Sequence, residues 1–300
     1  MRNLPFDKPG RFYRGNLHTH STVSDGRLPP AEVVAAYRDH GYDFLALTEH
    51  FMERFGWPVL DTRPFRGDGF TTLIGAELHA PSIEAGEAWH ILAVGLPLDF
   101  APSLPGEDGP ALARRARAAG AFVAIAHPYW YELSLADALA LDAAHAVEVW
   151  NYGCHVEVDR GDSWYMSDLL AGRGRRLTAC ATDDAHFATE DYRGGWVMVR
   201  AASLEPSALL EALKAGHYYS STGPTLEDVR VEGDLVVVRC SPARSIVVSG
   251  HGSKSERLNN LDRATEAALA LDRLRPGGRF RVTVIDEHGQ RAWSNPVWLD

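Results

Sequence analysis

The feature that most restricts how this chain can fold is the alternation of short apolar segments with helix-like segments over its first 220 residues. The apolar segments contain β-branched or aromatic residues, as buried parallel strands do. Proline near the start or glycine after the end marks several of the helix-like segments. We predict strands at residues 11–18, 42–48, 70–77, 89–95, 121–126, 146–150, 177–182 and 196–201, and helices at residues 30–40, 110–119, 135–141, 163–171 and 205–215. This order predicts an α/β barrel with parallel strands inside and helices outside.

The pattern changes at the end of this region. Residues 223–300 contain short strand-like segments separated by turn signals such as residues 232–234 and 276–278. We predict strands at residues 226–231, 235–240, 245–249, 280–285 and 292–298. Several short strands between turns predict a small antiparallel β-sandwich. The sequence therefore predicts two domains, residues 1–222 and residues 223–300.

Charge and composition exclude several classes of protein. The formal net charge of −10 argues against non-specific nucleic-acid binding, but leaves a nucleotide or short oligonucleotide open. The three cysteines include no CxxC pair, which disfavours a disulfide framework and a thiolate zinc site. Residues 1–10 lack the apolar stretch of a signal peptide, and no run of about 18 apolar residues predicts a membrane span. We expect a soluble cytoplasmic protein.

Side chains that bind metals recur where the predicted strands begin or end. His18 and His20 are two residues apart on an extended segment, so both imidazoles point to the same side and can reach one ion. In a parallel barrel the carboxyl ends of the strands meet at one mouth, where active sites lie. The candidate metal ligands are His18, His20, Asp25, His50, Glu77, His90, His127, Asp184 and His186.

These candidates are too many for one zinc ion, which takes three or four protein ligands. Two or three metal ions with Glu77 as a bridging carboxylate fit the set, and mixed histidine and carboxylate ligands suit Zn, Mn or Fe. Such a cluster can activate water for hydrolysis.

Five motifs resemble those of the PHP (polymerase and histidinol phosphatase) superfamily, in the same order. They are NLHTHS at residues 16–21 with SDG at 24–26, TEH at 48–50, GAE at 75–77, AHP at 126–128 and DAH at 184–186. The resemblance implies a distorted (β/α)7 barrel, a two- or three-metal site and phosphoester hydrolysis. The segments YYSSTGP at 218–224 and AWSNPVW at 292–298 are similar to the carbaryl-hydrolase-type (CehA/McbA) branch.

The resemblance also implies how the ligands divide among metals. One metal would take His18, His20, Glu77 and Asp184; a second would share Glu77 and take His90 and His127; a third would take Asp25, His50 and His186. Two positions depart from the family pattern. Glu49 stands where many members have aspartate, and Asp25 where some have histidine. On the sixth strand, where several members have a ligand, this chain offers Asn151, Cys154 and His155, none of which we predict to bind metal.

Several other polar residues are candidates for a role near the metals, and for His79 and Asp183 the sequence leaves two roles open. His79 follows Glu77 by two residues and is either a partner of the site or a surface residue. Asp183 either orients a metal-bound histidine or caps a turn. Arg193, in the segment after Asp184 and His186, is the strongest candidate for binding a substrate phosphate, ahead of three further arginines. These are Arg27, Arg54 and Arg66.

We therefore predict a metal-dependent hydrolase that cleaves a small phosphomonoester or phosphodiester with a metal-activated water. The predicted catalytic residues are Glu77, Asp184, His186 and Arg193. One alternative, suggested by the similarity to the CehA/McbA branch, is hydrolysis of a carbamate, ester or amide at the same cluster. The aromatic residues of the segment 51–69 would suit an apolar substrate. A second alternative is a metal-stabilised binding module without catalysis.

Overall fold

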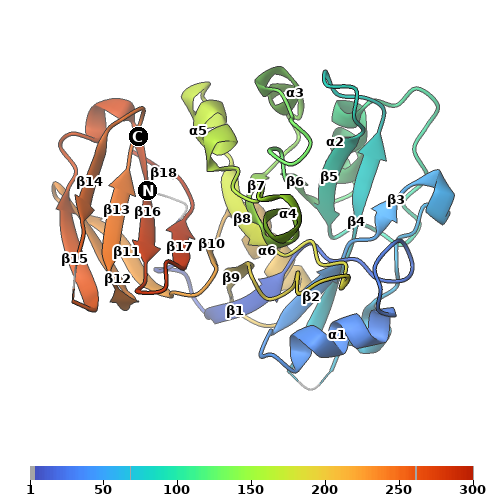
Figure 1. Cartoon of the computed structure of the whole chain (residues 1–300), viewed down its shortest axis with the longest axis horizontal. Helices are drawn as coiled ribbons and strands as arrows, with labels where there is room; N and C mark the ends of the chain where they lie inside the picture. Colours follow the sequence, from blue (N-terminus) through green and yellow to red (C-terminus); the bar gives the residue numbers. More distant parts are fainter. Residues whose placement is uncertain (1–3, 68, 261, 300) are drawn as a thin grey trace.

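The computed structural model describes residues 4–67, 69–260 and 262–299 as a mixed α/β fold with one large sheet (Figure 1). Seven neighbouring strands of this sheet form the part that holds the candidate ligands. They are β1 (Arg11–Asn16), β2 (Phe44–Leu47), β4 (Thr71–Ala80), β5 (Trp89–Val94), β6 (Phe122–Ile125), β7 (Ala146–Asn151) and β8 (Thr178–Thr182). The short β3 (His50–Phe51) pairs with the end of β4.

The two outer strands of this group, β1 and β8, meet just beyond their carboxyl ends. Thr19 and Ala185 form a single parallel bridge there, in which the His20 N–H donates to the Ala185 carbonyl at 2.9 Å. The Asp184 N–H in turn donates to the His18 carbonyl at 2.8 Å. Two loops that contain candidate ligands are thereby held side by side by the main chain.

Six α-helices occur in the described part of the chain. They are α1 (Pro30–Arg38), α2 (Gly109–Ala118), α3 (Leu135–Ala140), α4 (Tyr152–Val158), α5 (Trp164–Gly172) and α6 (Pro206–Ala215). In α1 the buried residues Val33, Val34 and Tyr37 follow helical spacing and pack beside Leu45 and Leu47 of β2. All five predicted helices are confirmed, whereas α4 was not predicted. Its start is capped by Asn151, whose Oδ1 accepts from the Cys154 N–H at 2.8 Å.

All eight strands predicted in the first 220 residues are present, but the expectation that they are parallel is wrong for two of them. β5 is antiparallel to both β4 and β6, and β9 (Trp196–Ala201) is antiparallel to β1. The reason is the connection: β4 passes into β5 through residues 81–88, all described and without a helix, and such a short link can join only antiparallel strands.

The C-terminal part has two sheets. β11 (Leu226–Glu232), β12 (Leu235–Ala243) and β15 (Ala264–Ala270) form a separate three-stranded sheet. The other strands are β13 (Ser245–Ser249), β14 (Ser255–Leu258), β16 (Arg279–Ile285), β17 (Arg291–Ser294) and β18 (Val297–Trp298). The two layers share one apolar core, which includes Val238 of β12 and Val282 of β16.

One of these C-terminal layers is continuous with the large sheet, because β17 pairs with β10 (Tyr218–Ser221), and β10 pairs with β9. The predicted β-sandwich is therefore joined to the first part of the chain by main-chain hydrogen bonds (Figure 1). The exact (β/α)7 arrangement and the domain boundary at residues 222 and 223 stay predictions. None of the described helices is long and apolar enough to cross a membrane.

Candidate metal centre

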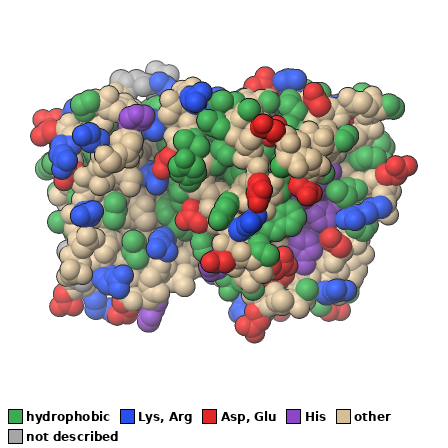
Figure 2. All heavy atoms as spheres, turned by 45° about the horizontal axis from the view of Figure 1, so that its top comes forward, with side chains coloured by type: hydrophobic (Ala, Val, Ile, Leu, Met, Phe, Trp, Pro, Cys, Tyr) green, Lys and Arg blue, Asp and Glu red, His purple; other side chains and the backbone are tan. Residues whose placement is uncertain are grey.

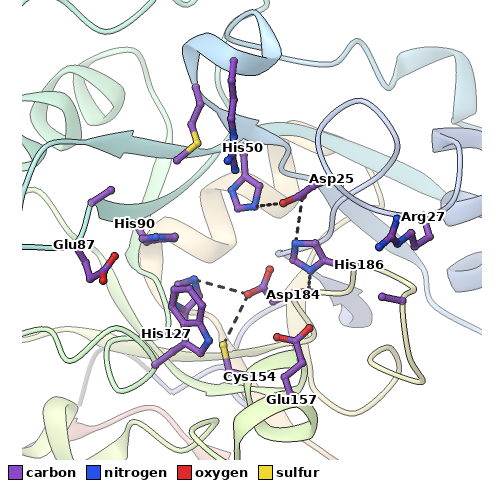
Figure 3. Close-up of a pocket in the computed structure, with 16 residues that line it drawn as sticks. Asp25, Arg27, His50, Glu87, His90, His127, Cys154, Glu157, Asp184 and His186 are labelled. Carbon is purple, nitrogen blue, oxygen red and sulfur yellow. Dashed lines mark hydrogen bonds and ion pairs between the residues drawn. The ribbon is translucent and has the colours of Figure 1, made fainter.

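All nine predicted ligands lie in one cluster of overlapping groups. Figure 3 shows the members that line the cavity, which are Asp25, His50, His90, His127, Asp184 and His186. His18 and His20 follow β1, His50 is in β3 and Glu77 is in β4. His90 begins its strand rather than ending it. It reaches the same place because β5 is antiparallel, which sets His90 directly opposite His79 near the end of β4.

The carboxylate of Glu77 is the centre of the cluster and is fully buried. Its Oε1 lies 2.7 Å from His90 Nδ1 and 3.1 Å from His127 Nε2. Its Oε2 lies 2.7 Å from His50 Nδ1 and 3.6 Å from His18 Nε2. Burial by itself raises the pKa of Glu77, but the surrounding imidazoles outweigh it and hold the pKa well below its usual value. Glu77 is thus an anion that faces histidines on both of its oxygens, as a bridging ligand must.

Asp184 forms a second contact point for the same histidines. Its Oδ1 lies 2.9 Å from His20 Nε2 and 3.2 Å from His18 Nε2, and its Oδ2 accepts from Asn151 Nδ2 at 3.0 Å. The Asp184 backbone is left-handed, with φ of 55°, and its N–H is bonded to the loop after β1. This turn directs the carboxylate back toward the histidines.

Asp25 and His186 form the outer part of the cluster. Asp25 lies 3.3 Å from His50 Nε2 and 3.4 Å from His186 Nε2. The rings of His20 and His186 are stacked with their centres 4.3 Å apart. The loop that holds Asp25 is fixed by Glu49, whose carboxylate accepts from Ser24 Oγ at 2.5 Å and from the Ser21 N–H at 3.1 Å.

The donors fit divalent cations. Two buried atoms that face each other are His18 Nε2 and Glu77 Oε2. Their close contacts with Asp184 and His50 do not have hydrogen-bond geometry, so both atoms are unsatisfied within the described residues. Two ligands that are each about 2 Å from one zinc ion are separated by about 3–3.5 Å, close to this 3.6 Å spacing. Five overlapping groups of His, Asp and Glu lie within metal-binding reach. They are His18, His20 and Glu77; His18, His127 and Asp184; Glu77, His90 and His127; His50, Glu77 and His79; and His20, Asp25, His50 and His186.

Glu148 of β7 is a residue of the centre that sequence reasoning missed. It is fully buried and accepts four hydrogen bonds. The donors are His18 Nδ1 at 2.8 Å, Thr182 Oγ1 at 2.5 Å, the His127 N–H at 2.6 Å and Asn151 Nδ2 at 3.0 Å. Since His18 Nδ1 binds Glu148, His18 Nε2 is the nitrogen that faces Glu77 and Asp184. The sequence signal that could have identified Glu148 was the presence of a glutamate inside the apolar segment 146–150.

The structure shows the surroundings of His79 and Asp183, for each of which the sequence left two roles open. His79 belongs to the centre: it is 5% exposed, and its Nε2 lies 2.8 Å from His50 Nδ1 and 3.5 Å from Glu77 Oε2. Asp183 caps a turn, and it reaches a candidate ligand only through Asn16, which donates to Asp183 and accepts from the His18 N–H. The Asp183 carboxylate accepts from three consecutive backbone N–H groups, at Arg193, Gly194 and Gly195, and from the Tyr37 hydroxyl.

A cavity of about 600 Å³ opens over the cluster, and Figure 2 shows histidine side chains gathered in a hollow on this face. Arg27, Arg54, Glu87 and Glu157 line the cavity, and in Figure 3 Arg27 lies beside His186, across the cavity from Glu87 and His90. Arg193 is not among the lining residues. Its guanidinium lies over the Tyr192 ring, and it lines a different cavity together with Trp150 and Arg291. Of the predicted phosphate-binding arginines, the structure therefore brings Arg27 and Arg54 to the cluster and leaves Arg193 outside it.

The fold has a counterpart among solved structures. A two-domain protein from Bacteroides vulgatus, described as containing a "predicted PHP-like metal-dependent phosphoesterase", aligns over 95% of both chains with a TM-score of 0.56 and 18% identity. An amidohydrolase from Chromobacterium violaceum aligns over 59% of this chain and 89% of its own, with a TM-score of 0.42 and 19% identity. No protein-family model and no protein of curated function matches the sequence. The resemblance to PHP-like phosphoesterases is thus confirmed at the level of the fold, while the similarity to the CehA/McbA branch stays a prediction.

Proposed function

We propose that this chain is a metal-dependent hydrolase that cleaves a small phosphomonoester or phosphodiester. The observation that most supports the proposal is the position of Glu77, a buried carboxylate with imidazoles against both oxygens. Such a carboxylate can join two metal sites, with His90 and His127 on one side and His18 and His20 on the other. His50, Asp25 and His186 would hold a third ion. When bound, these ions lower the pKa of a water molecule and offset charge on phosphoryl oxygens.

The protein's own residues have separate tasks. Arg27 and Arg54 line the cavity and would bind non-bridging phosphoryl oxygens with charge-assisted hydrogen bonds. Glu148 holds His18 in the tautomer whose Nε2 faces the cluster. Glu157 lines the cavity below Asp184 and His186 (Figure 3) and would donate a proton to the leaving oxygen. Partial burial and the nearby carboxylates of Asp184, Asp191 and Asp25 raise the pKa of Glu157, which favours the protonated form needed for that transfer.

The test is hydrolysis by protein loaded separately with Zn, Mn or Fe. The substrates are 4-nitrophenyl phosphate, bis(4-nitrophenyl) phosphate and 4-nitrophenyl dimethylcarbamate, which share one chromophoric product. We expect turnover of a phosphate ester that Glu77→Ala abolishes and that the exposed variant Glu84→Ala keeps. Turnover of the carbamate alone would replace phosphoester cleavage by attack at carbon. Bound metal without turnover of any of the three would favour the binding module.

A further inference from the structure

A second hollow adjoins the catalytic cavity and is mainly apolar. It measures about 370 Å³ and is lined by Trp57, Ala80 and Pro81, among others. Met52 and Ala88 line both the hollow and the larger cavity. The two spaces therefore meet at these two side chains.

His79 connects the hollow to the metal centre. It lines the hollow, while its Nε2 lies 3.5 Å from Glu77 Oε2. Its other nitrogen, Nδ1, is buried and has no hydrogen-bond partner among the described residues. An apolar group that lies against this ring would therefore displace no hydrogen bond between Nδ1 and the described residues. A ligand that extends from the centre into this hollow would lie against the His79 ring.

The walls of the hollow are fixed by the local backbone. The backbone of Trp57 has the left-handed conformation, with φ of 57°, and its N–H donates to the Met52 carbonyl at 3.0 Å. Its ring meets the buried Phe51 ring edge-on with centres 5.2 Å apart. Ala80 is the last residue of β4 and is 3% exposed. The hollow is thus formed before any ligand arrives, which lowers the entropic cost of binding.

We propose that this hollow receives an apolar leaving group, so that the preferred substrates are phosphoesters of an alkyl or aryl alcohol. The inference rests on the proposed function. Arg27, across the cavity, would bind the phosphoryl oxygens while the ester oxygen points toward Met52 and Ala88. Water adds to phosphorus, the bond from phosphorus to the ester oxygen breaks, and the alcohol leaves with a proton. The products are inorganic phosphate and an apolar alcohol.

Ethyl phosphate and 2-phenylethyl phosphate test the proposal, because both are esters of primary alcohols and differ mainly in apolar size. We expect kcat/KM, measured by phosphate release from metal-loaded protein, to be about 30-fold higher for the phenylethyl ester, since burying several apolar carbons is favourable. Ser82 lines the hollow and is exposed, so Ser82→Trp fills the hollow from its rim. This variant should reduce the ratio to about 3 or less and leave ethyl phosphate turnover unchanged. Ser82→Ala, which adds no volume, should keep the wild-type ratio.

Binding of ethylphosphonate and 2-phenylethylphosphonate, measured by calorimetry, separates this inference from the proposed function. Tighter phenylethyl binding that Ser82→Trp abolishes supports the hollow even if no ester is hydrolysed. Hydrolysis of both esters at similar kcat/KM, with a ratio that Ser82→Trp does not change, overturns the inference and leaves phosphoester hydrolysis standing. Unfolding temperatures of the two Ser82 variants show whether both are folded.

Discussion

Glu148 Oε1 lies 2.8 Å from His18 Nδ1, and both side chains are completely buried. The pair links β7 to the end of β1 across 130 residues of sequence. A carboxylate on the far nitrogen of a ligating histidine fixes the ring and strengthens it as a donor. Glu148 also accepts the His127 N–H, so one carboxylate positions two candidate ligands.

Replacing Glu148 by glutamine should weaken metal binding by about 10–100-fold. All four groups that contact this carboxylate are placed as donors, so the amide NH2 of glutamine would face at least one of them. Competition with a chelator measures the affinity of Glu148→Gln for each metal. Glu211→Gln on the exposed face of α6 is the control. Unchanged affinity in Glu148→Gln would mean that His18 needs no orienting partner.

Glu77→Ala should lower the metal content more than any other single change. The substitution removes the carboxylate whose Oε2 contacts His50 and whose Oε1 contacts His90 and His127. We expect two or three equivalents per wild-type chain, and one or fewer in the variant, by elemental analysis of protein purified without chelator. One equivalent or fewer in the wild type, even after reloading with each metal, would exclude the multinuclear site.

Arg27→Ala and Arg54→Ala should each lower kcat/KM for a phosphate monoester by about 10–100-fold, because each removes a charged hydrogen bond to phosphate. Arg193→Ala should change it by less than about 3-fold, because Arg193 lines a different cavity. Steady-state kinetics on 4-nitrophenyl phosphate compare the three variants. A loss confined to Arg193→Ala would show that the cavity over the cluster is not where phosphate binds.

Glu157→Gln should slow esters of alkyl alcohols more than those of 4-nitrophenol. A poor leaving group needs a proton in the transition state, whereas nitrophenolate does not, and general acid catalysis contributes about 10²–10⁴-fold. The measurement is kcat for ethyl phosphate and for 4-nitrophenyl phosphate in the variant and the wild type. Equal losses for both esters would assign Glu157 a role in binding instead of proton donation.

The surroundings of His145 predict that the free energy of unfolding falls in acid, independently of the metal centre. Its Nδ1 accepts from the Val123 N–H at 3.0 Å, and its ring stacks on Phe122. Burial and the nearby cations Arg117 and Lys214 lower the pKa of His145 to about 4. The folded state thus favours neutral His145. Its contribution to the free energy of unfolding is complete above the unfolded pKa of about 6.5 and is lost as pH falls toward 4.

The corresponding variant is His145→Asn, whose side-chain oxygen can still accept from the Val123 N–H. Between pH 7.5 and pH 5 the wild type should lose on the order of 1–2 kcal/mol more unfolding free energy than the variant. Urea unfolding of both proteins in chelator gives the two losses, and the cluster histidines contribute equally to each. A parallel pH dependence in the two proteins would rule out His145 as the source.

The sequence predicted the candidate ligands because each lies beside a strand with a clear pattern. His18 and His20 share a face by their spacing alone, and Glu77, His127 and Asp184 follow apolar runs that end in polar residues. All five predicted helices were also found from local pattern, because the capping residues and the apolar spacing of a helix involve residues that are close in sequence. The strand at residues 264–270 was missed because its sequence, ATEAALA, favours a helix; pairing with β12 overrides that preference.

Contacts between distant segments decided the rest. The antiparallel direction of β5, which brings His90 to the cluster, follows from the hairpin after β4 and from pairing with β6. Glu148 looked like a polar residue inside a strand until the fold set it against His18. The sequence by itself thus determined the nine candidate ligands, because ligand chemistry and strand periodicity are local. Only the tertiary structure decided which of them meet, which arginines face them and what space lies beside them, because those relations depend on how strands far apart in the chain pair and pack.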